Sequence, residues 1–156
     1  MFKKILVPTD GSPLSDKAVK SAIEFAAATG ASIFGLSVAQ LYPYMLMPEA
    51  GAMVDITMYE DAQDQIAQQY VDKLTAQAKL ANVPCIAMAR RAVHPYEEII
   101  AIAKDQQCDL IWMASHGRRG LDKLLLGSET QRVLAHSTIP VMVYRQPPAG
   151  MQASVK

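Results

Sequence analysis

The sequence predicts an α/β fold, a doubly wound five-stranded parallel sheet with helices on both faces. Five short apolar runs alternate along the 156 residues with four segments whose apolar positions recur every three or four residues. Parallel neighbours need crossover connections, and right-handed crossovers leave chiefly the doubly wound topologies. The chain is 51% hydrophobic and 19% charged, so a single domain of this length can bury a substantial core.

The chain begins with a β–α–β pattern. Residues 5–7 form a short apolar run that is typical of a buried strand. Ser12 precedes Pro13 at a predicted helix start, where a hydroxyl caps the first turn and proline sacrifices no hydrogen bond. Gly30 ends this helix, and residues 32–38 form the second apolar run.

The segment over residues 42–58 has no clean period. It holds two prolines, one glycine and four methionines, with almost no charge. A structureless connection of about this length is uncommon inside a compact domain. Two interpretations stay open: a loop that covers an apolar face, or a flap near a ligand or a dimer partner.

A second helix is predicted from Tyr59, because apolar residues recur there every four positions. They are Ala62, Ile66, Tyr70, Leu74 and Ala78. Residues 85–89 form a third short strand. His94 and Pro95 then open a third helix, whose acidic first turn suits the helix dipole.

The last third of the chain completes the alternation. Residues 109–114 begin with Asp109 and are then continuously apolar, as in a strand covered on both faces. A loop, a short helix and a last strand follow over residues 115–126, 127–136 and 139–144. Residues 146–156 are predicted to be a flexible tail, which leaves residues 1–145 as the domain.

Charge and composition exclude several classes of function. Fifteen basic and fifteen acidic residues give a formal net charge of zero, which argues against nucleic acid and acidic membranes as partners. No apolar run is long enough for a membrane span or a signal peptide, so a cytoplasmic protein is expected. Cys85 and Cys108 are interpreted as small buried hydrophobes in a reducing compartment, and no metal-ligand spacing is present.

Ligands of open α/β sheets bind beyond the carboxyl ends of the strands. Residues 8–12 and the segment from Ser115 to Thr130 follow two such ends, which would be neighbours in a sheet of order 3-2-1-4-5. Gly127 followed by Ser128 at a helix start offers free N–H groups to an anion, most often phosphate. The alternative is that Gly127 only breaks the loop and Ser128 only caps the helix.

Charged residues flank these segments. Arg118, Arg119 and Lys123 could close over a polyphosphate, or form a solvated loop. Asp10 could accept hydrogen bonds from an adenine amino group or a ribose hydroxyl, or could instead cap the following helix. His116 has no Ser or Asp companion for a hydrolytic triad and is interpreted as a loop residue.

Together these residues resemble the universal stress protein family. The resemblance runs from the segment Lys4–Ser12 to residues 140–143. The family's nucleotide-binding members have Gly, two residues, Gly, nine residues, Gly and then Ser or Thr. The corresponding positions here are Ala114, Gly117, Gly127 and Ser128, so alanine replaces the first glycine, and its methyl group is expected to weaken binding at most.

The resemblance implies the strand order 3-2-1-4-5 and ATP as the ligand, with a divalent ion, Mg²⁺, on its phosphates. It implies an adenosine site formed by Pro8, Thr9, Asp10 and the backbone of Val38, and a ribose site along Met113, Ala114 and Gly117. It implies phosphate contacts from Gly127, Ser128, Thr130 and the main chain of Glu129, whose carboxylate would repel phosphate.

The family also forms dimers through the last strand, and Ile139, Val141 and Val143 alternate there with other apolar residues. The leading interpretation is therefore a cytoplasmic, homodimeric, ATP-binding stress-response regulator. Hydrolysis should be slow at most, because the GxxxxGK[ST] loop of P-loop enzymes is missing. The alternative is a nucleotide-free dimeric interaction module with a degenerate site.

Overall fold

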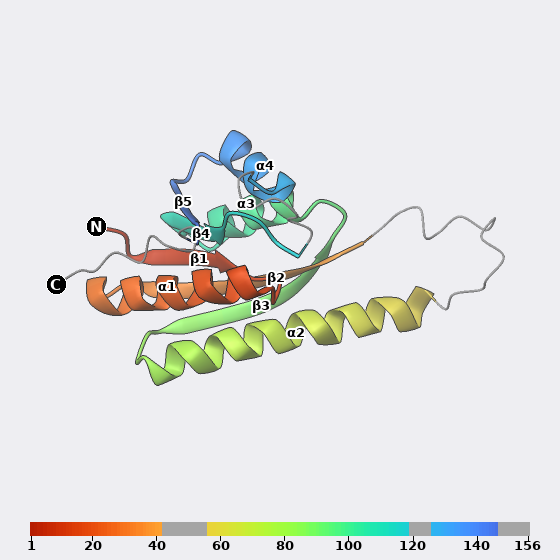
Figure 1. Cartoon of the computed structure of the whole chain (residues 1–156), viewed down its shortest axis with the longest axis horizontal. Helices are drawn as coiled ribbons and strands as arrows, with labels where there is room; N and C mark the ends of the chain where they lie inside the picture. The colour runs from red at the N-terminus through yellow and green to blue at the C-terminus, as the bar shows by residue number, and fades with distance from the viewer. Residues whose placement is uncertain (42–55, 119–125, 147–156) are drawn as a thin grey trace.

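The computed structural model describes residues 1–41, 56–118 and 126–146. Strands and helices alternate along the chain, as Figure 1 shows. They are β1 (Lys4–Pro8), α1 (Pro13–Thr29), β2 (Ser32–Gln40), α2 (Ile56–Leu80), β3 (Cys85–Ala92), α3 (Pro95–Asp105), β4 (Leu110–Ala114), α4 (Ser128–His136) and β5 (Val141–Tyr144).

The five strands form one sheet of order β3-β2-β1-β4-β5, and all four pairings are parallel. Helices α1 and α2 cover one face of the sheet, and α3 and α4 cover the other (Figure 1). The predicted fold class and strand order are therefore confirmed. The strand order reverses between β1 and β4, which places the ends of these two strands at the topological switch point.

Two apolar cores lie on the two faces of the sheet. Side chains of β1 alternate between them: Ile5 and Val7 pack under α1 and α2, whereas Leu6 packs under α3. Gly35 lets α2 approach β2 closely, because a Cβ atom there would lie 2.9 Å from Leu74 Cδ2. Trp112 belongs to the core under α1 and α2, and only 7% of that residue is exposed.

The start of α1 follows the predicted capping pattern. Ser12 is the N-cap, its hydroxyl accepts a hydrogen bond from Ser15 N–H at 3.3 Å, and Pro13 opens the helix. Gly30 ends α1 in the left-handed conformation, with a φ of 73°. The sequence therefore encodes both ends of this helix locally.

Several boundaries differ from those predicted. Strand β3 continues to Ala92 because Arg90 and Arg91 still pair with β2, although polar side chains interrupt the apolar run. Strand β5 begins at Val141 instead of residue 139, because the preceding Pro140 has no N–H to donate to the ladder. Residues 42–55 and 147–156 lie outside the described residues, and with them most of the predicted loop or flap and of the tail.

The two cysteines have different environments, and neither forms a disulfide. Cys108 is buried in the core under α3, as predicted, and burial raises the pKa of its thiol to about 11. The thiol is therefore protonated and unreactive at neutral pH. Cys85 is only partly buried. Within the described ranges, no helix combines the length and the apolar character that crossing a bilayer requires.

We predict that Leu74→Ala lowers the free energy of unfolding by about 2–5 kcal/mol, because it leaves a cavity under α2. Leu80→Ala is the matched control, since Leu80 ends the same helix and is 86% exposed. We expect it to change the free energy by less than about 0.5 kcal/mol. Urea denaturation followed by the fluorescence of Trp112 measures both, and equal losses would contradict the packing of α2.

Candidate functional site

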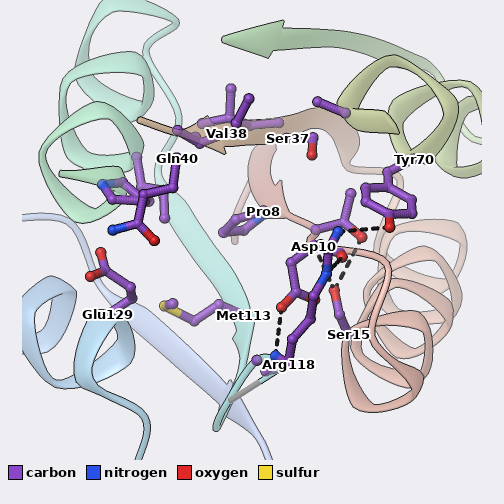
Figure 2. A pocket seen from close by; sticks show the side chains of 18 of the residues that line it. Pro8, Asp10, Ser15, Ser37, Val38, Gln40, Tyr70, Met113, Arg118 and Glu129 are labelled. Atoms are coloured by element: carbon purple, nitrogen blue, oxygen red, sulfur yellow. Dashed lines mark hydrogen bonds between the residues drawn. The ribbon is translucent and has the colours of Figure 1, made fainter. Parts of the chain in front are cut away.

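A cleft of about 680 Å³ lies at the carboxyl ends of the strands. It extends over the ends of β1, β2 and β4 and is bounded by helices α2, α3 and α4 (Figure 2). This is the position that the switch point of a doubly wound sheet predicts for a ligand.

Every described residue that the resemblance or the loop charges assigned to the site lines this cleft. They are Pro8, Thr9, Asp10, Val38, Met113, Ala114, Gly117, Arg118, Gly127, Ser128, Glu129 and Thr130. The structure therefore brings together residues from four segments that are far apart in the sequence. Their contacts with a ligand stay a prediction.

Asp10 connects the loop after β1 to the loop after β4. Its Oδ1 accepts a hydrogen bond from Ser12 N–H at 3.0 Å, and its Oδ2 accepts one from Arg118 N–H at 3.0 Å. The proposed alternative for Asp10 is thus partly correct, because the carboxylate does bind the backbone at the start of α1. Each oxygen still has a second lone pair that a ligand hydroxyl or amine can use.

Gly117 is a glycine because of this close approach. A Cβ atom at position 117 would lie 2.4 Å from Asp10 Oδ2, well inside van der Waals contact. Any side chain there would displace the carboxylate of Asp10. Because the second glycine of the motif has no side chain, the carboxylate of Asp10 can stay where it is.

Arg118 has a different place from the one expected for a residue that closes over phosphates. Its Nε donates to Asp10 O at 2.7 Å, and its Nη2 donates to Tyr70 Oη at 2.7 Å. Its guanidinium also lies over the Tyr70 ring, 5.0 Å from the centroid. Figure 2 shows Arg118 beside Asp10 and Glu129 at the other side of the cleft. Arg119 and Lys123, named with it, lie outside the described residues.

The first turn of α4 forms the other end of the cleft. Gly127 is the N-cap and has no side chain to bond the helix N–H groups. Its own N–H donates to Ser115 O at 2.7 Å, and a Cβ atom there would lie 3.0 Å from His116 Cα. Because the first N–H groups of a helix have no partners inside it, those from Ser128 onward can bind an anion.

The side chains of Glu129 and Thr130, in the first turn of α4, bind other parts of the protein. Thr130 is buried, and its hydroxyl donates to Ala114 O at 3.0 Å, which fixes α4 to the end of β4. Glu129 Oε2 accepts from Tyr96 N–H at 2.7 Å, at the start of α3, and Glu129 Oε1 lies 3.5 Å from Arg132 Nη1. Glu129 and Thr130 are therefore left with only their main chain for a phosphate, as expected for Glu129.

Val38 offers its backbone to the cleft for a geometric reason. In a parallel strand, the N–H and C=O of one residue point to the same neighbour and alternate along the chain. Leu36 O accepts from Thr9 N–H at 2.8 Å, so Val38, two residues later, also points its polar groups to the β1 side. Strand β1 has already ended at Pro8 and has no residue left to pair with them.

Ala114 replaces a motif glycine without filling the cleft. Its methyl group belongs to a small apolar cluster with Leu14 and Ala18 of α1, and Tyr144 packs against that cluster. The methyl group thus points to the α1 face, where it contributes to the core. The departure from the motif has a structural role that its sequence position could not reveal.

Sequence analysis missed the contribution of α2 to the site. Ile66, Ala67 and Tyr70 line the cleft, and so do Ser37 and Arg132. The apolar residues that recur every four positions and predicted α2 include Ile66 and Tyr70. Their spacing does not predict that α2 extends past the end of β1. The glycine at position 11 was the one sequence feature that could have indicated this approach of α2. Its φ is 71°, and a Cβ atom there would lie 2.0 Å from Tyr70 Cε1.

The position of α2 is fixed by an ion-pair network with β3. Arg91 Nη1 lies 2.8 Å from Glu60 Oε2, and Arg91 Nε donates to Asp64 Oδ1 at 2.8 Å. The hydrogen bond from Arg91 lowers the pKa of the Asp64 carboxyl. These residues are partly exposed, so the network orients the first turns of α2 more than it stabilises the fold.

His116 also lines the cleft. Its Nδ1 lies 3.2 Å from Ser115 Oγ, a loop contact of the kind expected. Among residues 1–41, 56–118 and 126–146, no group of three or more His, Cys, Asp or Glu side chains is placed to hold a metal ion.

Comparison with known proteins gives a consistent result. The model of the universal stress protein family matches residues 1–145. Universal stress protein MJ0531 of Methanocaldococcus jannaschii is 33% identical over 147 residues, which are 94% of this chain and 84% of the relative. The solved structure of protein MJ0577 superposes with a TM-score of 0.74 at 28% identity, covering 96% of this chain and 99% of the other.

A further solved structure is a universal stress protein in complex with cAMP. It shares the fold with a TM-score of 0.68 at 21% identity, and the match covers 94% of this chain and 99% of the other. The family model spans nearly the whole chain, and the relatives match along almost all of their own length. The chain belongs to the universal stress protein family.

Proposed function

We propose that this protein is a cytoplasmic, homodimeric stress-response regulator that binds ATP in the cleft and hydrolyses it slowly at most. The proposal rests on one observation: the same cleft joins the unsatisfied first turn of α4 to the unpaired backbone of Val38. The free N–H groups of α4 can bind phosphates. The N–H and C=O of Val38 can bind the edge of a base that has adjacent donor and acceptor atoms.

The remaining lining supports the same orientation of the ligand. Asp10 and Gly117 lie between the two ends, where a ribose would meet the free lone pairs of the carboxylate. A protein that shares the fold is described in complex with cAMP, which agrees with an adenine nucleotide as the class of ligand. Since no described group of side chains can hold a metal, Mg²⁺ would be bound through the phosphates.

Calorimetric titration of nucleotide-stripped protein with Mg-ATP tests the proposal. We expect a micromolar Kd for ATP and weaker binding of AMP, because only the longer phosphate chain reaches the first turn of α4. Gly117→Ala should weaken ATP binding by at least about tenfold, since the new Cβ displaces the Asp10 carboxylate.

Gly30→Ala is the matched control. Gly30 has a φ of 73°, and no atom lies within 4 Å of the place that a Cβ would take, so the change strains the end of α1 far from the cleft. It should lower stability and leave ATP affinity unchanged. If no heat is detected up to millimolar ATP, the proposal is rejected in favour of a nucleotide-free dimeric interaction module with a degenerate site.

We expect ATP hydrolysis below about 0.01 s⁻¹, the rate of a GTPase that carries its catalytic arginine in cis. The first turn of α4 presents backbone N–H groups but no described lysine aimed at the phosphates, and His116 contacts Ser115. His116→Ala should therefore leave phosphate release unchanged in a coupled assay. Turnover above about 1 s⁻¹ that His116→Ala abolishes would show that the site is catalytic.

The dimer is proposed to form through the free edge of β5. Tyr144 O and Pro140 O accept hydrogen bonds from β4, so the alternate residues Val141 and Val143 point their N–H groups outward. Val143→Pro should remove an outward donor without touching the β4–β5 ladder, and should convert the dimer to a monomer in sedimentation equilibrium. Val143→Ala keeps the N–H and should stay dimeric; a wild-type monomer, or a dimeric Val143→Pro, would contradict this interface.

A further inference from the structure

The cleft has a second compartment that the assigned residues do not explain. It lies on the α2 face of the sheet and is lined there by Ser37 and Ala39 of β2 and by Tyr59, Gln63, Ile66, Ala67 and Tyr70 of α2. Ala39, Ile66 and Ala67 offer a ligand only carbon atoms. Arg118 already occupies the Tyr70 hydroxyl.

Ser37 is the exception among the buried hydroxyl side chains of the described residues. Thr9, Ser12, Ser15, Ser115 and Thr130 each make a side-chain hydrogen bond. Ser37 is just 2% exposed, and no hydrogen bond joins its hydroxyl to any described residue. The hydroxyl of a residue this deeply buried usually has a partner in the protein, so the position requires an explanation.

The Ser37 hydroxyl is not sealed in the core. Across the described ranges, Trp112 Nε1 is the one fully enclosed side-chain polar atom without a partner, so Ser37 Oγ must open onto the cleft that its residue lines. Figure 2 shows its oxygen turned from β2 into the open space, toward the side where Asp10 and Tyr70 lie.

The chemistry of this compartment matches a heteroaromatic base. Ile66 and Ala67 provide an aliphatic wall against which a flat ring can pack, and Ser37 provides one hydroxyl that can either donate or accept. If phosphates bind at α4 and the sugar at Asp10, the base reaches the end of β2. That is the end where Ser37 and Val38 lie side by side.

We propose that Ser37 is a specificity-determining residue that hydrogen-bonds the purine base of the bound nucleotide. Ser37 Oγ either donates to a ring nitrogen or accepts from an amino group, on the α2 side of the base. The Val38 backbone binds a different edge of the same ring. This inference rests on the proposed function, because it names a contact of the nucleotide in that cleft.

The test compares two ligands, ATP and adenosine, on two variants, each titrated by calorimetry. Ser37→Ala should weaken both ligands by the same factor, about 3–10-fold, because the lost bond is to the base that they share. Ser128→Ala removes a hydroxyl at the phosphate end and should weaken ATP but not adenosine. Ser32→Ala is the matched control, since Ser32 lies on the same strand outside the cleft and bonds Lys3 O.

The outcomes separate the two proposals. If wild-type protein binds ATP and Ser37→Ala binds it equally well, or loses ATP affinity but keeps adenosine affinity, the role of Ser37 is overturned and the proposed function stands. If wild-type protein binds neither ligand, both proposals fail. Urea unfolding of Ser37→Ala, followed by Trp112 fluorescence, should give the same midpoint as wild type, since the hydroxyl opens onto the cleft and bonds no described residue; a lower midpoint would point to a structural role instead.

Discussion

The unequal length of two neighbouring strands determines the whole site. Strand β1 ends at Pro8, whereas β2 continues to Gln40, so the end of β2 has a partner only on its β3 side. The loop after β1 turns away through Gly11, whose φ of 71° favours glycine and whose missing side chain makes room for Tyr70. The space that β1 vacates is the centre of the cleft, and it exposes the backbone of Val38.

This geometry also lets Asp10 combine its structural role with the proposed binding role. The carboxylate binds the N–H groups of Ser12 and Arg118, and thereby ties the loop after β1 to the loop after β4. A carboxylate held by two backbone donors is fixed in place and keeps lone pairs for a ligand. A structural role and a binding role for Asp10 are therefore not alternatives, because the first supplies the rigidity that the second needs.

The parts of the fold that depend on local patterns were predictable. Alternating apolar runs indicated the order of strands and helices, and Ser12 and Gly30 marked the ends of α1. The glycine spacing, together with the resemblance to the universal stress protein family, indicated residues that line the cleft. The parts that depend on tertiary contacts were not. The position of Arg118 is set by the ring and hydroxyl of Tyr70, and that of the Ala114 methyl by α1; neither partner is near in sequence.

Both arginines that line the cleft in the described part of the chain are held by other groups, and this limits what the site can do. The guanidinium of Arg118 donates to the backbone carbonyl of Asp10 and to the hydroxyl of Tyr70, and Arg132 lies beside the carboxylate of Glu129. In the proposed site, phosphate binding would depend on the N–H groups and dipole of α4, which interact with a bound phosphate before and during transfer alike. Interactions that are equal in the ground state and the transition state give affinity without acceleration. The described residues of the cleft therefore fit the proposed role in nucleotide binding, and acceleration would require a further charge that acts only as the transition state forms.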